Sequence, residues 1–182
     1  MNPVRLMLVL LLLTALSCAA PLPLHAGGSY QGRTVLLKNR EYAEALIEGI
    51  RGARSSITCS YYLFKISGSR GNLPRRVAEE LIRAGKRGVV VTVILERDSG
   101  RNDRLSEDNR STASFLSRGG VKVIFDPPSV VTHAKVTVID GRHVYLGSHN
   151  LTQGALTRNN ELSVRIDSPE LAAEVTSYLE RL

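Results

Sequence analysis

Hydrophobic and polar positions follow two different periods along the chain, and the pattern predicts a succession of strands and helices. Alternating or continuous apolar runs predict strands at residues 34–37, 56–64, 89–95, 121–125 and 161–166. Apolar stripes at three- and four-residue spacing predict helices at residues 40–53, 73–86 and 111–118, with a last helix after Ser168-Pro169. Asn39 and Ser168 are expected to cap the first and last helices, and the polar residues 97–109 are expected to form a loop.

This order of elements predicts the fold class. Strands that alternate with helices build a sheet with helices packed on its faces. Residues 89–95 are continuously apolar, which is typical of a strand covered on both faces. We therefore expect an α/β fold, with a mixed β-sheet covered by helices on both faces, in one domain of residues 27–182.

The first 26 residues differ from the rest, and we expect them to be a signal peptide. Arg5 precedes an apolar stretch, residues 6–16, that only Thr14 interrupts. This stretch is short for a membrane span, and Ala26 offers a small residue at the cleavage position. The alternatives are an uncleaved membrane anchor at residues 6–16 and a lipoprotein signal ending at Cys18. A cleaved signal predicts a periplasmic protein.

Charge and cysteine content narrow the class of partner. The 182-residue chain has 24 Lys and Arg against 17 Asp and Glu, a formal net charge of +7. Only five of the basic residues are Lys. Arg binds phosphate oxygens through two parallel hydrogen bonds, so this bias suits a polyanionic substrate. Cys59 is the one cysteine after residue 26, and without a disulfide partner it is expected in the core.

Residues 132–150 predict a β-hairpin around which the candidate chemistry gathers. Asp140-Gly141 separates two runs rich in β-branched residues, and Gly accepts the positive φ of a tight turn. The turn is expected to have two residues, either Gly141-Arg142 or Asp140-Gly141. The first register pairs His133 with Asn150, and the second pairs His133 with Ser148.

In either register the open end of the hairpin is expected to present four polar side chains on one face. They are His133, Lys135, Ser148 and Asn150. An imidazole can act as nucleophile or acid–base near neutral pH, an ammonium can balance phosphate charge, and a hydroxyl and an amide can hold oxygens. This combination suits an anionic, phosphate-like transition state. The alternative is an ordinary hairpin with a polar, solvated face.

The same residues resemble a known family, the phospholipase D superfamily with its HKD motif. The elements that carry the resemblance are His133-x-Lys135-x4-Asp140, Gly147-Ser148-x-Asn150-x-Thr152 and Glu161. The size and the single motif copy are most similar to the small bacterial HKD endonucleases of the Nuc type. Thr132 departs from the pattern, because many members carry a second His at that position.

The resemblance implies a phosphodiesterase that needs no metal or other cofactor and forms a phosphohistidine. The expected catalytic residues are His133, Lys135, Asp140 and Glu161, and the expected substrate-binding residues are Ser148 and Asn150. His133 would attack phosphorus, and a second His would protonate the leaving alkoxide. Glu161 would hydrogen-bond the far ring nitrogen of His133 and stabilise its charge. Asp140, at the turn, would have a structural hydrogen-bonding role.

The sequence does not contain a second copy of the motif. His143 and His149 are expected to be exposed strand residues rather than zinc ligands, because no further ligand stands at zinc-site spacing. We therefore expect a homodimer with twofold symmetry, which presents His133 of both subunits to one active site at the interface.

The expected substrate is nucleic acid, DNA and/or RNA, bound through its backbone with little regard to sequence. A phospholipase D or phosphatidyltransferase is an alternative, since the same chemistry cleaves any phosphodiester. Against it, the chain has no Trp and no amphipathic membrane-binding helix with aromatic anchors. A non-catalytic nucleic-acid-binding module is a further alternative, but binding alone needs no nucleophile.

Overall fold

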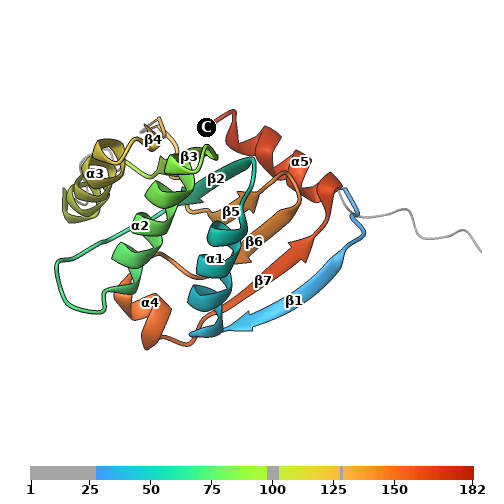
Figure 1. Ribbon diagram of the computed structural model, residues 1–182, viewed down its shortest axis with the longest axis horizontal. Helices are drawn as coiled ribbons and strands as arrows, with labels where there is room; N and C mark the ends of the chain where they lie inside the picture. The colour runs from blue at the N-terminus through green and yellow to red at the C-terminus, as the bar shows by residue number, and fades with distance from the viewer. Residues whose placement is uncertain (1–27, 98–102, 128) are drawn as a thin grey trace, which may run out of the picture.

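A mixed sheet forms the centre of the computed structural model, which describes residues 28–97, 103–127 and 129–182 (Figure 1). Its strands are β1 (Arg33–Lys38), β2 (Ser56–Tyr61), β3 (Val90–Leu95), β4 (Lys122–Phe125), β5 (Lys135–Ile139), β6 (His143–Gly147) and β7 (Leu162–Asp167). The helices in the same residues are α1 (Glu41–Gly52), α2 (Leu73–Lys86), α3 (Asp103–Arg118), α4 (Gln153–Thr157) and α5 (Pro169–Leu179). The strand order is β1-β7-β6-β5-β2-β3-β4. β3 pairs in parallel with β2 and β4, and the other neighbours are antiparallel.

Helices cover both faces of this sheet, as the sequence predicts, but unequally. α1 and α2 lie side by side on one face (Figure 1), and α3 contributes Leu116 to the same hydrophobic core. α5 packs on the other face, where Ala172 and Leu179 meet Val136 and Val138 of β5. Cys59 is buried in the larger core, as expected.

The starts of α2 and α5 follow the local sequence, whereas the start of α1 does not. Ser168 caps α5, and Asn72 caps α2 by accepting a hydrogen bond from the N–H of Arg75 at 2.9 Å. The prediction that Asn39 caps α1 is wrong. Asn39 has a φ of 51°, and the residue before the helix is Arg40, which makes no side-chain cap bond. Asn39 instead binds the backbone of Glu161.

The loop predicted at residues 97–109 is helical from Asp103 onward, where α3 begins, and residues 98–102 of it lie outside the described residues. Polar residues occur there because one of them tethers the helix to the sheet. The Asn109 side chain is buried, accepts from the N–H of Phe64 and donates to the carbonyls of Tyr62 and Glu96, all at 2.9 Å. The polar pattern therefore combines a buried hydrogen-bonding residue with exposed side chains on the surface of a helix.

The β5–β6 hairpin forms where it was predicted, but with neither predicted register. Ile139 pairs with His143, so the turn has three residues instead of two. Asp140 and Gly141 both have positive φ, 54° and 58°, and the N–H of Arg142 donates to the Ile139 carbonyl at 3.1 Å. The turn therefore shifts the second strand by one position relative to either predicted pairing, and the ladder does not pair His133 or Lys135 with Ser148 or Asn150.

No helix within residues 28–97, 103–127 and 129–182 combines the length and the apolar character needed to cross a bilayer. The expected signal peptide, residues 1–26, lies outside the described residues.

Candidate active site

His133 and Lys135 lie at one end of the sheet, where β5 and β7 begin and where β1, β2, β3, β4 and β6 finish. We refer to it as the site end and to the opposite end as the far end. The His133 ring meets the Tyr62 ring edge-on, with centroids 4.5 Å apart. The ammonium of Lys135 is 5.2 Å from the centroid of Tyr62 and donates to the His133 carbonyl at 2.7 Å. Tyr62, just after β2, therefore joins the two motif residues.

The backbone just before His133 is held in place through Thr132. Thr132 is buried, and its N–H donates to a carboxylate oxygen of Glu96 at 2.6 Å. The ring nitrogens of His133 have no hydrogen-bond partner within the described part of the chain, and the residue is exposed. The loop is thus held by its backbone while the imidazole faces outward.

The charges around His133 favour a neutral ring beside a cation. Burial lowers the pKa of His133, and the positive charge of Lys135 lowers it further. Burial also lowers the pKa of Lys135, an effect that the negative charge of Glu161 partly offsets. A neutral imidazole has a free lone pair, which is the form a nucleophile or a general base needs.

Ser148 and Glu161 form the second half of the candidate site. The Ser148 hydroxyl accepts from the N–H of Leu162 at 3.1 Å and donates to Glu161 in a short hydrogen bond. Asn159 donates to the other carboxylate oxygen of Glu161 at 3.1 Å. The hydrogen bond expected from Glu161 to His133 is absent. β6 lies between β7 and β5 in the sheet. The strands next to His133 and Glu161 are therefore about 10 Å apart, twice the strand spacing, and Ser148 at the end of β6 lies between the two residues.

Asn150 follows Ser148 and has unused hydrogen-bonding capacity. Its side-chain Oδ1 is buried and has no partner in the described structure. The neighbouring backbone is held firmly, since the N–H of Leu151 donates to the Leu63 carbonyl at 3.0 Å. An unsatisfied buried polar atom costs about 1–3 kcal/mol, and a bound ligand or water can complete its bonding.

Asp140 does not reach this site. Its carboxylate accepts from the N–H groups of Arg54, Ser55 and Ser56 and from the Ser55 hydroxyl, at 2.8–3.1 Å. It follows β5, which Lys135 begins, so the two residues are about 17 Å apart along an extended strand. This is the structural hydrogen-bonding role expected of Asp140, and its inclusion among the catalytic residues finds no support in its position.

The two other histidines of the hairpin have separate environments. His149 is fully buried, so the expectation that it is an exposed strand residue is wrong. Its ring stacks on Tyr42 of α1 at 4.3 Å, on the face of the sheet where Tyr145 also packs against α1. His143 is part-exposed at the far end. No cluster of three or more His, Cys, Asp or Glu side chains able to hold a metal occurs among the described residues.

Comparison with known proteins identifies the family. Residues 46–182 match the family described as cardiolipin synthase, PLD-like domain. The chain belongs to the phospholipase D superfamily. In structure it is similar to a phospholipase D family member, Nuc from Salmonella typhimurium, with a TM-score of 0.68 and 24% identity over 83% of this chain and 93% of that chain.

Relatives by sequence have several names. The chain is 35% identical to a phospholipase D of Rickettsia conorii over 104 residues, 57% of this chain and 48% of that protein. It is 29% identical to the virion nicking-joining enzyme of vaccinia virus over 139 residues, 73% of this chain and 31% of that protein. The chain thus matches at most about half the length of these two relatives in the superfamily.

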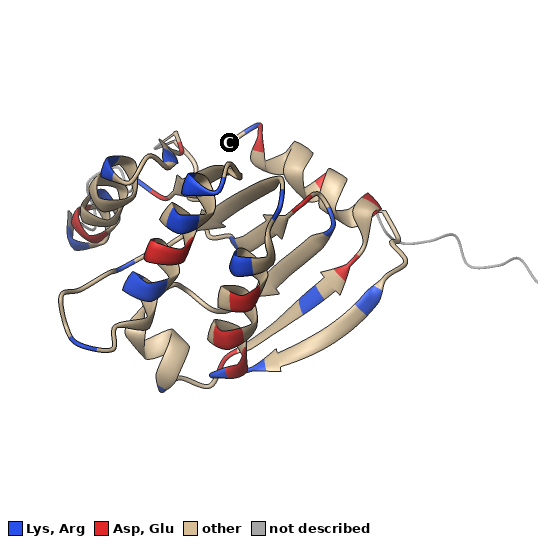
Figure 2. Ribbon diagram, viewed as in Figure 1, with Lys and Arg blue, Asp and Glu red and all other residues tan. Residues whose placement is uncertain are grey.

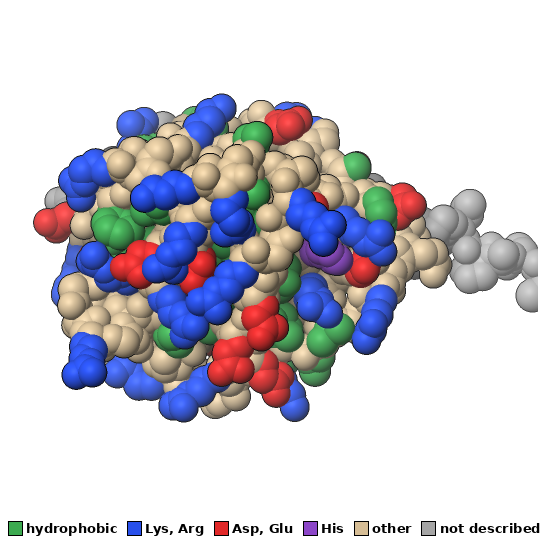
Figure 3. All heavy atoms as spheres, in the orientation of Figure 1, with side chains coloured by type: hydrophobic (Ala, Val, Ile, Leu, Met, Phe, Trp, Pro, Cys, Tyr) green, Lys and Arg blue, Asp and Glu red, His purple; other side chains and the backbone are tan. Residues whose placement is uncertain are grey.

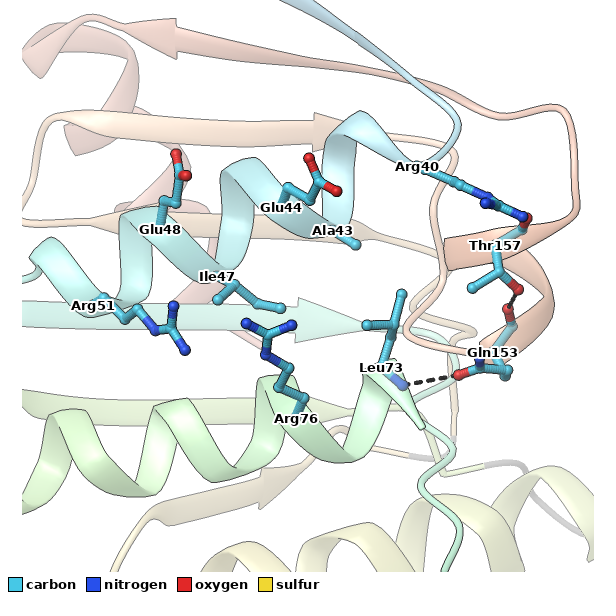
Figure 4. A pocket seen from close by; sticks show the side chains of 10 residues that line it. All are labelled: Arg40, Ala43, Glu44, Ile47, Glu48, Arg51, Leu73, Arg76, Gln153 and Thr157. Carbon is cyan, nitrogen blue, oxygen red and sulfur yellow. Dashed lines mark hydrogen bonds between the residues drawn. The ribbon is translucent and has the colours of Figure 1, made fainter. Parts of the chain in front are cut away.

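Two cavities lie close to the candidate site of this phospholipase D-like chain. The first, of about 650 Å³, is a groove between α1 and α2, where Arg51 and Arg76 point toward each other (Figure 4). None of the expected site residues line it. The second, of about 320 Å³, adjoins Glu161 and is termed the rim cavity; its lining residues are Lys38, Asn39, Arg40, Glu41, Thr157, Arg158, Asn159 and Asn160.

Sequence reasoning missed four residues that shape the site: Tyr62, Asn39, His149 and Asn159. Tyr62 stands in an apolar run that was interpreted as strand throughout, so its place just beyond β2 gave no signal. Asn39 precedes a helix, and this position pointed to a cap. The asparagine pair before Glu161 was the one available signal, because Asn often binds neighbouring polar groups in turns.

Proposed function

We propose that this protein is a metal-independent phosphodiesterase, acting on nucleic acid through a phosphohistidine. The observation that carries the proposal is a solvent-exposed His133 whose pKa is lowered by partial desolvation and by the charge of Lys135, and whose ring nitrogens are free within the described residues. Such a ring is an available nucleophile, and the buried Lys135 beside it attracts a phosphate. Tyr62 holds the two residues in one cluster.

In the proposed reaction, a ring nitrogen of His133 attacks phosphorus and the bond to the leaving alkoxide breaks. The alkoxide takes a proton from a second imidazole, which the negative charge of the bound phosphodiester favours in its protonated form, and which then removes a proton from water. That water hydrolyses the phosphohistidine and restores His133. Lys135 and Asn150 bind the phosphoryl oxygens, while the charge of Glu161 keeps Lys135 protonated. Ser148 holds Glu161 in the free protein and can turn to the phosphoryl group when substrate binds.

The second imidazole in this proposal is His133 of a symmetry-related copy. The α5 face of the sheet supports a dimer, because one helix covers it only partly. Leu36, Leu146 and Leu162 are 55%, 41% and 58% exposed there, and the register places Leu36 and Leu146 on either side of Val164. These three leucines form an exposed apolar strip. The strip reaches the site end, because Leu162 directly follows Glu161. A partner that covers the strip with its own α5 would bring the two site ends together.

Mixed subunits test the shared site. A heterodimer of wild-type and His133→Ala chains is expected to be inactive, because one imidazole cannot serve both as nucleophile and as acid. Mild quenching should trap at most one phosphoryl group per wild-type dimer, on His133. Full activity in a demonstrated monomer, or two labelled histidines per dimer, would contradict the shared site.

Nucleic acid is favoured over lipid by the basic rim cavity. Lys38, Arg40 and Arg158 line it and are exposed, and only Glu41 opposes them. Basic side chains also spread over the face formed by α1 and α2, interrupted by a group of acidic ones (Figure 3). The vaccinia relative is named a nicking-joining enzyme, which agrees with this substrate class. The names phospholipase D and cardiolipin synthase make lipid diesters the second candidate.

The substrate class can be decided with charge reversals. We expect the wild-type protein to cleave plasmid DNA or RNA in EDTA, faster than phosphatidylcholine or cardiolipin vesicles. Lys38→Glu with Arg158→Glu should raise KM for an oligonucleotide about tenfold or more and reduce the salt dependence of binding by roughly one unit of slope for each lost phosphate contact. Hydrolysis of bis-p-nitrophenyl phosphate, which does not reach the rim cavity, should change little.

The matched control is Lys86→Glu with Lys122→Glu, which changes net charge equally. Both lysines are exposed and lie at the far end, where α2 finishes and β4 begins. Activity that requires Mg²⁺ or Zn²⁺ after EDTA would contradict the metal-independent mechanism. Preferred hydrolysis of lipid vesicles would contradict the nucleic-acid substrate.

We also propose that residues 1–26 direct export and are then removed. The mass of protein recovered from the periplasm should correspond to a chain that starts near Gly27. A full-length mass in the membrane fraction would support an anchor at residues 6–16 instead.

A further inference from the structure

His149 is a buried imidazole that the proposed chemistry does not use, and its two ring nitrogens have different partners. Nε2 lies 2.9 Å from the carbonyl oxygen of Asn39, and Nδ1 lies 2.7 Å from the hydroxyl of Ser163. A carbonyl oxygen can only accept, so Nε2 carries the hydrogen and Nδ1 accepts from Ser163. Burial lowers the pKa of His149, which agrees with a neutral ring.

Asn39, the residue that His149 binds, is held in an uncommon backbone conformation. Its φ of 51° is sparsely populated by residues other than glycine, although Asn tolerates it best. In this conformation the Asn39 N–H donates to the Glu161 carbonyl at 3.0 Å. Its side-chain oxygen accepts from the Glu161 N–H at 2.9 Å. Asn39 thus binds both the carbonyl and the N–H of Glu161, and we refer to these two hydrogen bonds as the clasp.

The clasp determines where the Glu161 carboxylate stands. Glu161 precedes β7, so its backbone lies outside the ladder of that strand and is fixed by Asn39 instead. From this position the carboxylate meets Ser148 and raises the pKa of Lys135. The chain of contacts from His149 through Asn39 to Glu161 therefore ends at the charge next to Lys135.

We infer that His149 is a positioning residue, which acts through Asn39 to set the place of the Glu161 carboxylate at the active site. The inference rests on the proposed function, because it presumes that Glu161 serves the reaction. His149 contributes a directed donor to Asn39 and a flat ring stacked on Tyr42, with 11° between the planes. A simple hydrophobic side chain at this position would provide the stacking without the donor.

His149→Phe is the decisive variant, since it keeps an aromatic ring against Tyr42 and removes both hydrogen bonds. A displaced carboxylate should lower kcat roughly tenfold and change KM by less than about twofold. His149→Gln restores an N–H donor, so its kcat should lie between those of His149→Phe and the wild type. If His149→Phe does not fold, Asn39→Gly is the substitute, because glycine keeps the positive φ but lacks the oxygen that binds Glu161.

Tyr145→Phe is the matched control. Tyr145 is equally buried, and its hydroxyl donates to a backbone carbonyl, that of Ala45, at 3.2 Å. It has no link to Glu161. If His149 were only a core residue, both variants would lower the melting temperature and neither would lower kcat. The positioning role predicts that both lose stability and only His149→Phe loses kcat.

A double-mutant cycle with Glu161→Gln completes the test. Once the carboxylate charge is gone, its position matters less, so His149→Phe should add less than about a twofold loss of kcat in that background. A wild-type kcat for His149→Phe, or the same loss with and without Glu161→Gln, would overturn the inference while leaving the proposed function intact. Failure of the proposed function is distinct. It would appear as no diester hydrolysis, or as a wild-type kcat for Glu161→Gln, and it would overturn both.

Discussion

The two ends of the β5–β6 hairpin contain the same kinds of side chain but differ in how these are paired, although His143 at the far end also has a buried Nδ1 without a partner in the described structure. At the far end, Asp140 accepts hydrogen bonds from four donors, and Arg142 binds Asp167 through two at 2.6 and 3.2 Å. At the site end, the His133 ring has no hydrogen bond within the described residues, and Asn150 has a buried oxygen without a partner. Both ends look equally polar in sequence.

The difference shows how a site can be separated from a structural cluster. Hydrogen bonds that are fully made stabilise the fold and leave nothing for a ligand. Polar groups that are held in place but incompletely bonded cost stability and can bind substrate. Figure 2 shows why charge alone does not make this distinction, because acidic and basic residues both occur on α1 and on α2.

The largest effect is expected from His133→Ala. Loss of the nucleophile should reduce kcat by about a thousandfold or more. The melting temperature should change by no more than about 2 °C, because the ring is exposed and contacts mainly Tyr62. Turnover of a small diester and a thermal melt measure both quantities. A variant that keeps wild-type turnover would contradict the phosphohistidine, and one that unfolds would make the site end structural.

Local sequence signals predicted several of the elements that position the hairpin. The cap at Ser168, the buried strand β3 and the place of the hairpin follow from short-range patterns. The register did not follow, because Asp140 joins Gly141 at positive φ and lengthens the turn by one residue. The sequence indicates a positive φ at Gly141, but it does not indicate that the neighbouring Asp140 has a positive φ as well.

Contacts that depend on the order of the strands could not be predicted from the sequence. The position of β6 between β5 and β7 places Ser148 next to Glu161 and leaves His133 without the expected carboxylate. The burial of His149 has the same origin, since its partners are Ser163 of β7 and Asn39, which lies between β1 and α1. Alternation predicts the face of a residue only while the strand continues.

Asp140→Asn should have the second-largest effect, and on stability rather than on turnover. The amide still accepts but loses the charge that strengthens four hydrogen bonds, so unfolding should become easier by about 2 kcal/mol, less than a fully buried carboxylate would give. The kcat of the folded protein should stay within about twofold of wild type. Urea denaturation at pH 7 measures the first quantity, and a large loss of kcat at unchanged stability would place Asp140 in the reaction.

The stability difference between wild type and Asp140→Asn should also depend on pH. Burial acts to raise the pKa of Asp140, but hydrogen bonds from Ser55, Ser56 and Arg54 outweigh it and the pKa is lowered. A lowered carboxylate pKa stabilises the fold above the unfolded pKa of about 3.9 and loses this effect as pH falls through the folded value. The difference should therefore be complete at neutral pH and shrink below about pH 4. A difference that grows in acid would contradict the hydrogen-bonding role.

The smallest expected effect is a change in the pKa of His133 at the site end. Burial and the charge of Lys135 both lower the pKa of His133, so Lys135→Gln should raise it while the burial effect remains. NMR titration of the imidazole measures this without any need for turnover, with the resonance assigned by its loss in His133→Ala. Lys86→Gln, at the far end, should leave the His133 titration unchanged. If the pKa of His133 stayed the same or fell in Lys135→Gln, Lys135 would not be the cation that keeps this imidazole neutral, and the nucleophile would need another source of activation.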